Sequence, residues 1–291
     1  MPLPDGFDPR LTPARDDVAA VSLKGVVAAA RYAEGEPREV AEETAPLRRR
    51  PAFDAPQDTQ ALFGERLTVY ADDGEGWAFV QLAGDGYVGY VPSEALRPPG
   101  PQATHKVAAP RTFIFPGPDI KLPPTGALGF GSRVAVREVR GTFAVTREGF
   151  LFARHLAPLD AGETDFVEVA GRFLGVPYLW GGRSALGLDC SGLVQTALSA
   201  CGLPCPRDSD MQERALGEAV PLNAPLRRGD LLFWPGHVAI VETPESLLHA
   251  NAFHMMVARE PLEPALARIA AAGSVLRSIR RLPGPTTRLT P

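Results

Sequence analysis

At 291 residues the chain has room for two or three domains. Its 45% apolar and 22% charged residues suit ordinary hydrophobic cores, and its net charge of -4 gives no electrostatic reason to expect a nucleic acid or a membrane as partner. The first residues lack a basic start followed by an apolar run, and no stretch approaches the roughly 18 apolar residues of a membrane span. Since its three cysteines also fit a reducing compartment, we expect a cytoplasmic protein.

The N-terminal segment, residues 1–45, carries no chemical motif. Alanine and valine are frequent between Asp16 and Tyr32, and this composition favours a short helix there. We expect residues 1–45 to be a helical segment that packs on the domain that follows.

Residues 46–160 contain a weak internal repeat. Gly64-Glu65-Arg66-Leu67-Thr68-Val69 is echoed by Gly131-Ser132-Arg133-Val134-Ala135-Val136, and the apolar runs and glycine turns that follow recur in the same order. Short runs with a period of two, divided by glycine turns, are typical of strands in small barrels. The sequence thus predicts two small β-barrels, at 46–99 and 103–160, joined by a proline-rich linker.

The pattern changes after residue 163. Helices are predicted at 165–174, from residue 190 onward and at 264–272, and apolar runs typical of strands occur at 230–234, 237–242, 247–251, 255–259 and 275–281. Strands packed behind a central helix make an α+β domain, which we place at 163–285.

Cys190 is the candidate nucleophile. Glycines precede it, Asp189 is the predicted N-cap, and an apolar face continues through Leu193, Val194 and Ala197, so Cys190 is expected at a helix start. The positive end of a helix dipole lowers the pKa of a thiol, and the thiolate is the reactive form. The alternative is a small buried side chain without chemistry.

Two histidines downstream favour catalysis over packing. A cysteine peptidase needs an imidazole beside the thiol and a third polar group that orients it. His237, at the start of a predicted strand, is assigned as the base, and His249, on the next strand, as the orienting group; His254 and Asn251 are the alternatives for the third role. Pairs spaced as C-x-x-C or H-x-x-x-H are absent from the sequence, so we expect no metal and no cofactor.

Six ordered motifs carry a resemblance to a known family. They are Pro177-Tyr178-Leu179-Trp180-Gly181-Gly182, Asp189-Cys190-Ser191-Gly192, Pro206-Arg207-Asp208-Ser209, Gly229-Asp230-Leu231, Gly236-His237-Val238 and His249-Ala250. Together they resemble the NlpC/p60 family of papain-like cell-wall cysteine peptidases. The resemblance implies a papain-like core with Cys190, His237 and His249 as the triad, and it places Tyr178 where its hydroxyl and the Cys190 N–H hold an oxyanion. It also implies a substrate site that includes Trp180, Asp189, Ser191, Asp208 and Ser209.

The two barrels resemble bacterial SH3 domains, an arrangement similar to a subgroup of γ-D-glutamyl-L-diamino acid endopeptidases. This resemblance implies cleavage of murein peptides that begin with a free L-Ala, in cell-wall peptide recycling. Asp58 stands where the subgroup pairs an acid with the substrate amine, and Tyr87 where a tyrosine walls the cleft. The alternatives are a thiol amidase or acyltransferase on another amide, and a murein-peptide-binding module without catalysis.

Overall fold

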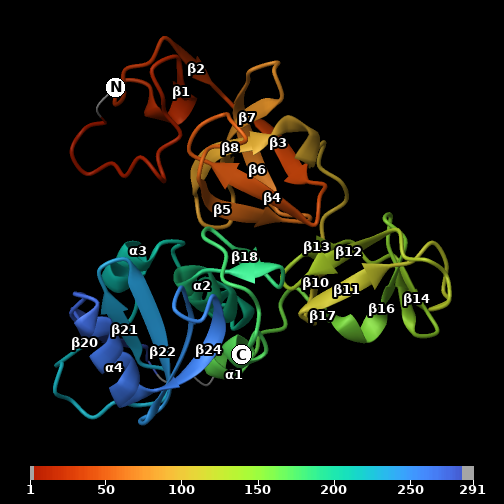
Figure 1. Ribbon diagram of the computed structural model, residues 1–291. Coiled ribbons are helices and arrows are strands. Elements are labelled where there is room, and N and C mark those ends of the chain that lie inside the picture. Colours follow the sequence, from red (N-terminus) through yellow and green to blue (C-terminus); the bar gives the residue numbers. More distant parts are fainter. Residues whose placement is uncertain (1–2, 284–291) are drawn as a thin grey trace, which may run out of the picture. The chain divides into compact units, whose positions relative to one another are not determined.

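The computed structural model describes residues 3–283 and divides into two compact units, Met1–Leu159 and Asp160–Pro291 (Figure 1). Each unit has its own hydrophobic core. No helix among the described residues combines the length and the apolar character that crossing a bilayer requires.

The helix expected between Asp16 and Tyr32 is absent. The segment instead forms strands β1 (Val18–Ala20) and β2 (Arg31–Ala33), which pair in parallel, and one 3₁₀ turn, η1 (Val21–Leu23). All three residues of β1 are buried, and Val18 packs with Ala71 and Phe79 of the first barrel. A strand places consecutive residues on opposite faces, so this continuous apolar run is covered on both sides. Tertiary packing has overridden the local helix propensity.

The first barrel is a curled antiparallel sheet of seven strands in the order β5-β4-β8-β7-β6-β3-β9. Its strands are β3 (Glu36–Val40), β4 (Thr44–Arg48), β5 (Gln57–Leu62), β6 (Arg66–Asp72), β7 (Trp77–Leu82), β8 (Val88–Pro92) and β9 (Leu96–Arg97). The sheet therefore begins at Glu36, inside the segment that was expected to be helical. Alternate side chains of these strands, among them Leu47, Leu67 and Val80, form the barrel core.

The second barrel is built from shorter strands in three small sheets, β13-β10-β17, β11-β12 and β14-β15-β16. They are β10 (His105–Val107), β11 (Arg111–Ile114), β12 (Gly126–Gly129), β13 (Arg133–Val134), β14 (Glu138–Arg140), β15 (Phe143–Val145), β16 (Phe150–Phe152) and β17 (Leu156–Pro158). The last elements of the two barrels show the internal repeat. A 3₁₀ turn, η2 (Ser93–Ala95), joins β8 to β9, and its counterpart η3 (Ala153–His155) joins β16 to β17.

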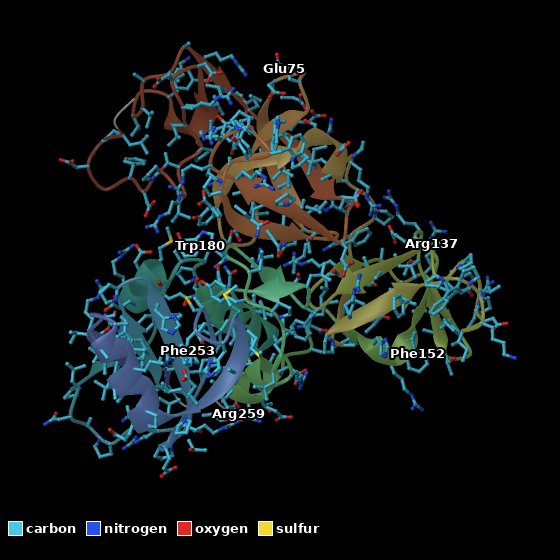
Figure 2. All side chains as sticks on the ribbon, in the orientation of Figure 1. Glu75, Arg137, Phe152, Trp180, Phe253 and Arg259 are labelled. Carbon is cyan, nitrogen blue, oxygen red and sulfur yellow. The ribbon has the colours of Figure 1, made fainter. Side chains whose placement is uncertain are left out.

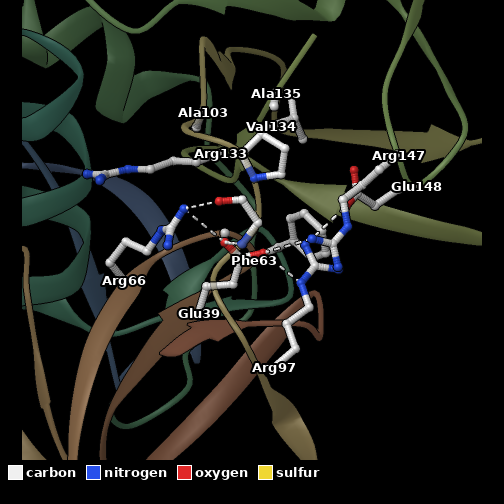
Figure 3. A pocket seen from close by; sticks show the side chains of 13 residues that line it. Glu39, Phe63, Arg66, Arg97, Ala103, Arg133, Val134, Ala135, Arg147 and Glu148 are labelled. Carbon is white, nitrogen blue, oxygen red and sulfur yellow. Dashed lines mark hydrogen bonds and ion pairs between the residues drawn. The ribbon is translucent and has the colours of Figure 1, made fainter. Parts of the chain in front are cut away.

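The turn between β5 and β6 ties the two barrels together. Phe63 lies in this turn, yet its ring packs in the core of the second barrel with Val107 and Leu128. The backbone N–H of Arg133 donates to the Phe63 carbonyl at 2.9 Å. Beside it, Glu39 accepts from Arg97 at 2.7 Å, and Arg97 also pairs with Glu148 of the second barrel (Figure 3).

Gly64 of this turn is expected to tolerate substitution less well than Gly74, a glycine of the turn between β6 and β7. Its φ is +74°, and a Cβ there would lie 2.2 Å from the carbonyl oxygen of Arg133. We expect Gly64→Ala to lower the free energy of unfolding by about 2 kcal/mol more than Gly74→Ala. Gly74 has a φ of +71° but open space around it. Both variants therefore share the backbone strain, and only Gly64→Ala has the clash. Hydrogen exchange of the β5 and β10 amides measures the difference, and equal protection in both variants would contradict this account.

The second unit is α+β, as predicted, with a six-stranded antiparallel sheet in the order β20-β25-β21-β22-β23-β24 and a two-stranded sheet, β18-β19. Its elements are α1 (Phe166–Gly171), β18 (Arg183–Ser184), β19 (Gly187–Leu188), α2 (Cys190–Ala200), α3 (Ser209–Ala215), β20 (Glu218–Val220), β21 (Leu231–Trp234), β22 (His237–Thr243), β23 (Ser246–Asn251), β24 (Met256–Pro261), α4 (Leu262–Ala271) and β25 (Ser278–Arg281). Helix α2 packs against β22 and β23, and α4 against β23 and β24. The sheet thereby brings the start of α2 close to the start of β22 (Figure 1).

Candidate active site

Cys190 is the first residue of α2, and Asp189 is its N-cap. The Asp189 carboxylate accepts from the backbone N–H of Gly192 at 2.6 Å and from that of Gly181 at 2.8 Å. A side chain at position 192 is excluded, because its Cβ would lie 2.2 Å from the Gly182 carbonyl oxygen. The glycines around the cysteine therefore let the preceding loop fold closely onto the helix start.

A buried arginine completes this loop. Arg207 is 1% exposed and donates to both oxygens of Asp189, at 2.9 and 2.6 Å, and to the Ser191 hydroxyl at 2.9 Å. The two backbone groups and the two guanidinium nitrogens together fill the acceptor positions of the carboxylate. Asp189 thus holds the start of α2 in place; direct substrate contacts of Asp189 and Ser191 stay predictions.

The thiol lies against the segment that contains His237. The Cys190 Sγ is 4.0 Å from the carbonyl oxygen of Gly236, and the backbone N–H of Val238 is directed at the sulfur. His237 is the residue between these two and opens β22, which pairs with β21 through a tight turn at Gly236. The sheet edge therefore presents the imidazole next to the start of α2.

Of the three candidates for the third position, His249 is hydrogen-bonded to His237. The Nε2 of His237 is 2.9 Å from the Nδ1 of His249, with ring centroids 5.2 Å apart. Asn251 accepts instead from the N–H of His254 at 2.8 Å, and the His254 ring is 3.1 Å from the same oxygen. Asn251 and His254 therefore bind each other and hold the turn between β23 and β24.

The sequence analysis did not identify Glu260 as a site residue. Its Oε2 is 2.7 Å from the Nε2 of His249 and 2.5 Å from the Nη2 of Arg268, a residue of α4. His249 is 1% exposed and Glu260 is 8% exposed. A line of polar groups thus extends from the His237 imidazole through that of His249 to a carboxylate and a guanidinium.

Burial sets the charge state of the thiol and the imidazole. Burial, with a smaller contribution from the Asp189 carboxylate, raises the pKa of Cys190 to about 12. Burial also lowers the pKa of His237 to about 3, with His249 and Arg268 acting in the same direction. The expectation of a lowered pKa for the Cys190 thiol is therefore wrong, because the effect of burial outweighs any lowering by the helix start. At neutral pH Cys190 is therefore a thiol and His237 a neutral imidazole.

Tyr178 is close enough to Cys190 for the two groups to interact electrostatically. Its backbone N–H donates to the Met255 carbonyl at 2.9 Å, and a bridge joins Tyr178 to Leu188 just before Asp189. Burial, together with Cys190 and Asp189, raises the pKa of the Tyr178 hydroxyl, so this group stays protonated and able to donate. It has the chemistry that an oxyanion donor needs.

The remaining predicted site residues of the second unit lie on nearby elements. Trp180 is 64% exposed and Phe253 is 65% exposed; both are labelled in Figure 2. Asp208 is the N-cap residue of α3 and Ser209 its first residue, on a helix that the sequence analysis did not predict. Their substrate contacts stay predictions, as does that of Trp180.

Asp58 and Tyr87 belong to the first unit. Asp58 pairs with Arg49 at 2.8 Å, so an amine bound by Asp58 would share its carboxylate with a guanidinium. Tyr87 is 3% exposed and packs in the core of the first barrel. The roles of the two residues in an amine clamp stay predictions. Within residues 3–283 no cluster of three or more histidine, cysteine or acidic side chains suits a metal ion.

Two family models match parts of this chain. Residues 47–96 match the model of the bacterial dipeptidyl-peptidase SH3 domain, and residues 175–268 match that of the NlpC/P60 family. The chain is 32% identical to the gamma-D-glutamyl-L-lysine dipeptidyl-peptidase of Bacillus subtilis over 60% of this chain and 63% of that protein. It is 28% identical to the Bacillus cereus protein of the same name over 70% of each chain.

A solved structure shares the fold. The crystal structure of an NlpC/P60 family protein from Bacillus cereus has a TM-score of 0.71 and 22% identity, and the match covers 85% of this chain and all of that one. The chain spans less than two thirds of the B. subtilis relative. The matched models, the shared fold and the cysteine at the start of α2, next to the strand of His237, lead to one conclusion: residues 175–268 form an NlpC/P60 domain with a papain-like α+β fold, and SH3-like barrels precede it in the chain.

Proposed function

We propose that this protein is a cysteine peptidase that hydrolyses the bond between γ-D-Glu and a diamino acid in murein peptides. The observation that carries the proposal is the placement of the Cys190 sulfur against Gly236 and Val238, with His237 hydrogen-bonded to His249 at 2.9 Å. The names of the two Bacillus relatives support the choice of bond.

The first half-reaction forms an acyl-enzyme. His237 takes the proton of the Cys190 thiol as the sulfur attacks the γ-carbonyl carbon of D-Glu. Cys190 occupies the first position of α2, where a backbone N–H has no acceptor within the helix, and this N–H with the Tyr178 hydroxyl stabilises the oxyanion. The C–N bond then breaks, and the imidazolium returns its proton to the departing amine of the diamino acid.

The second half-reaction releases the dipeptide. His237 removes a proton from a water molecule, whose oxygen attacks the thioester carbon. The C–S bond breaks, the imidazolium protonates the departing thiolate, and L-Ala-D-Glu leaves with a new γ-carboxyl group. The enzyme returns to the thiol and neutral imidazole state that burial favours.

The proposal includes a requirement for a free amino terminus. A buried ammonium group needs a carboxylate partner, and we propose Asp208 for that role, so acetylation of the amine would remove the positive charge that the carboxylate binds. We also propose that the substrates are soluble recycled peptides in the cytoplasm. Cell fractionation that finds the protein elsewhere would contradict the proposed location.

The test is a panel of synthetic peptides analysed by mass spectrometry. L-Ala-γ-D-Glu-L-Lys and its meso-diaminopimelate counterpart should yield L-Ala-D-Glu. The N-acetylated peptides should be cleaved at least about 10²-fold more slowly, because they have lost the charge that the carboxylate binds. Equal rates for free and acetylated peptides would remove the amine requirement alone. Binding of the tripeptides without any product would favour the non-catalytic module.

The lowered pKa of His237 predicts activity in mild acid. An imidazole with a pKa of about 6.5 would be about 97% protonated at pH 5 and unable to accept the thiol proton. Because burial lowers the pKa of His237 to about 3, the ring stays neutral, and we expect kcat/KM at pH 5 to remain within about threefold of its value at pH 7. Initial rates at constant ionic strength, with circular dichroism as the control for folding, measure this. An acid limb centred near pH 6.5 would show that His237 titrates as an ordinary histidine.

A further inference from the structure

The hydrogen bond between His249 and Glu260 has a consequence for the base. Glu260 lies on β24, directly opposite Leu247 in the register of β23 and β24, and His249 is two residues further along β23 on the same face. The carboxylate reaches the outer nitrogen of His249 at 2.7 Å, while the inner nitrogen faces His237. The protonation of each nitrogen along this line therefore depends on its neighbour.

The carboxylate end of the line accepts hydrogen bonds only. Burial alone would raise the pKa of Glu260, but hydrogen bonds from Arg268 and from His249 outweigh it and lower the pKa. Glu260 is therefore ionised and has no proton to donate. The Nε2 of His249 must carry the hydrogen of the 2.7 Å bond.

The two imidazoles then have only one arrangement of protons. Burial lowers the pKa of His249, so the ring is neutral, and with its proton on Nε2 its Nδ1 is an acceptor. His237 must then donate from its own Nε2 across 2.9 Å. Its ring is neutral as well, which leaves Nδ1 of His237 as the bare nitrogen.

We propose that Glu260 is a positioning residue of this active site, which fixes the tautomers of His249 and His237 so that the Nδ1 of His237 is free to take the thiol proton. The inference rests on the proposed function for its catalytic consequence, but the tautomers themselves are independent of the substrate. The reverse arrangement would direct two lone pairs at each other between His249 and Glu260. It would also place a hydrogen on the nitrogen that has to act as base.

Arg268 opposes the electrostatic effect of the Glu260 carboxylate on the imidazoles. Its guanidinium donates to both oxygens of Glu260 and lies 4.2 Å from the centroid of the Phe253 ring. The charged and titratable groups that face the two imidazoles are Cys190 from α2, Glu260 from β24, Arg268 from α4 and His254 from the turn after β23. Arg268 disfavours a positive charge on either ring, and Glu260 favours one on His249.

The test compares Glu260→Met with Glu260→Gln. Glutamine keeps an oxygen where His249 and Arg268 both donate, so the tautomers should persist and kcat should fall by less than about tenfold. Methionine removes the acceptor and leaves Arg268 to donate to the His249 Nε2. The protons should then shift, with a hydrogen on the Nδ1 of His237 and kcat lowered at least about 10²-fold at a nearly unchanged KM. Glu242→Met is the matched control, because Glu242 also pairs with an arginine of the same sheet, at 2.7 Å, but contacts no histidine ring.

Two-dimensional ¹⁵N NMR of histidine-labelled protein reads the tautomers directly. The signals of His237 and His249 are assigned by their loss in the His237→Gln and His249→Gln variants. Both rings should be Nε2–H tautomers in the wild type and in Glu242→Met. A His249 that is protonated on Nδ1 in the wild type would overturn the proposal, as would wild-type tautomers and kcat in folded Glu260→Met.

A sign test covers the case in which Glu260→Met does not fold. Glu260→Gln should shift the acid limb of kcat/KM to lower pH, and Arg268→Gln should shift it to higher pH, because the two side chains act on the imidazoles with opposite charge. Shifts of the same sign in both variants would overturn the proposal. If the peptide panel gives no product while the tautomers are as expected, the proposed function fails and the positioning role stands.

Discussion

Cys190→Ala is expected to lower kcat for the tripeptide by about 10⁴-fold or more, because no other group can form the thioester. The sulfur lies against the Gly236–Val238 segment and is not part of the hydrogen bond between His237 and His249, so we expect its removal to leave that bond in place. Product release measured by mass spectrometry over several hours sets the upper limit on the residual kcat of Cys190→Ala.

Cys201→Ala is the matched control for this experiment. Cys201 lies at the other end of the same helix, α2, as its C-cap residue. Replacement of Cys201 should leave kcat within about twofold, since Cys201 lies at the opposite end of α2 from Cys190. Turnover by Cys190→Ala at more than a few per cent of the wild-type rate would remove the acyl-enzyme mechanism.

Arg207→Met is expected to destabilise the second unit by about 3–5 kcal/mol, since it leaves the buried Asp189 carboxylate without its guanidinium partner. The unpaired charge would lie beside the thiol, where a carboxylate already raises the pKa of Cys190 and Arg207 offsets part of that effect. We therefore expect the variant to lose activity as well as stability. Hydrogen exchange of the α2 amides measures the loss of stability within this unit.

Arg214→Met provides the comparison for an exposed ion pair. Arg214 pairs with Asp210 on α3 at 3.0 Å, one helical turn apart and largely in solvent. Loss of this ion pair should lower the free energy of unfolding by no more than about 0.5 kcal/mol. Similar changes in both variants would mean that burial of the Asp189–Arg207 pair is not what stabilises the helix start.

Local signals around Cys190 were strong enough to predict the central part of the site. An N-cap aspartate, glycines and an apolar helical period agree on where α2 begins, and the structure places that start at Cys190 with Asp189 as its cap. The pairing of His237 with His249 followed from two adjacent apolar strands, and the distance between their rings agrees with that prediction. These elements are defined by neighbours in the sequence, which is why the sequence was sufficient.

Features that depend on distant neighbours were missed. The buried partner of Asp189 is an arginine that any local pattern would place in solvent, and the low pKa expected for Cys190 neglected the desolvation that comes with burial. The apolar run at Val18 reads locally as helix, but packing on the first barrel makes it a strand. One signal for Glu260 was available, because a hairpin turning after Asn251 sets the residues that share a face with His249.

The ring of Phe63 limits how the N-terminal unit can be divided. The first barrel supplies this ring to the core of the second, where it lies among Val107, Ile114 and Leu151. A fragment that starts at residue 103 would have a cavity in the core of the second barrel, where the Phe63 ring is missing. A fragment that ends at residue 99 would expose the Phe63 ring to water. We therefore expect the two SH3-like barrels to fold as a pair, even though no sheet is shared between them.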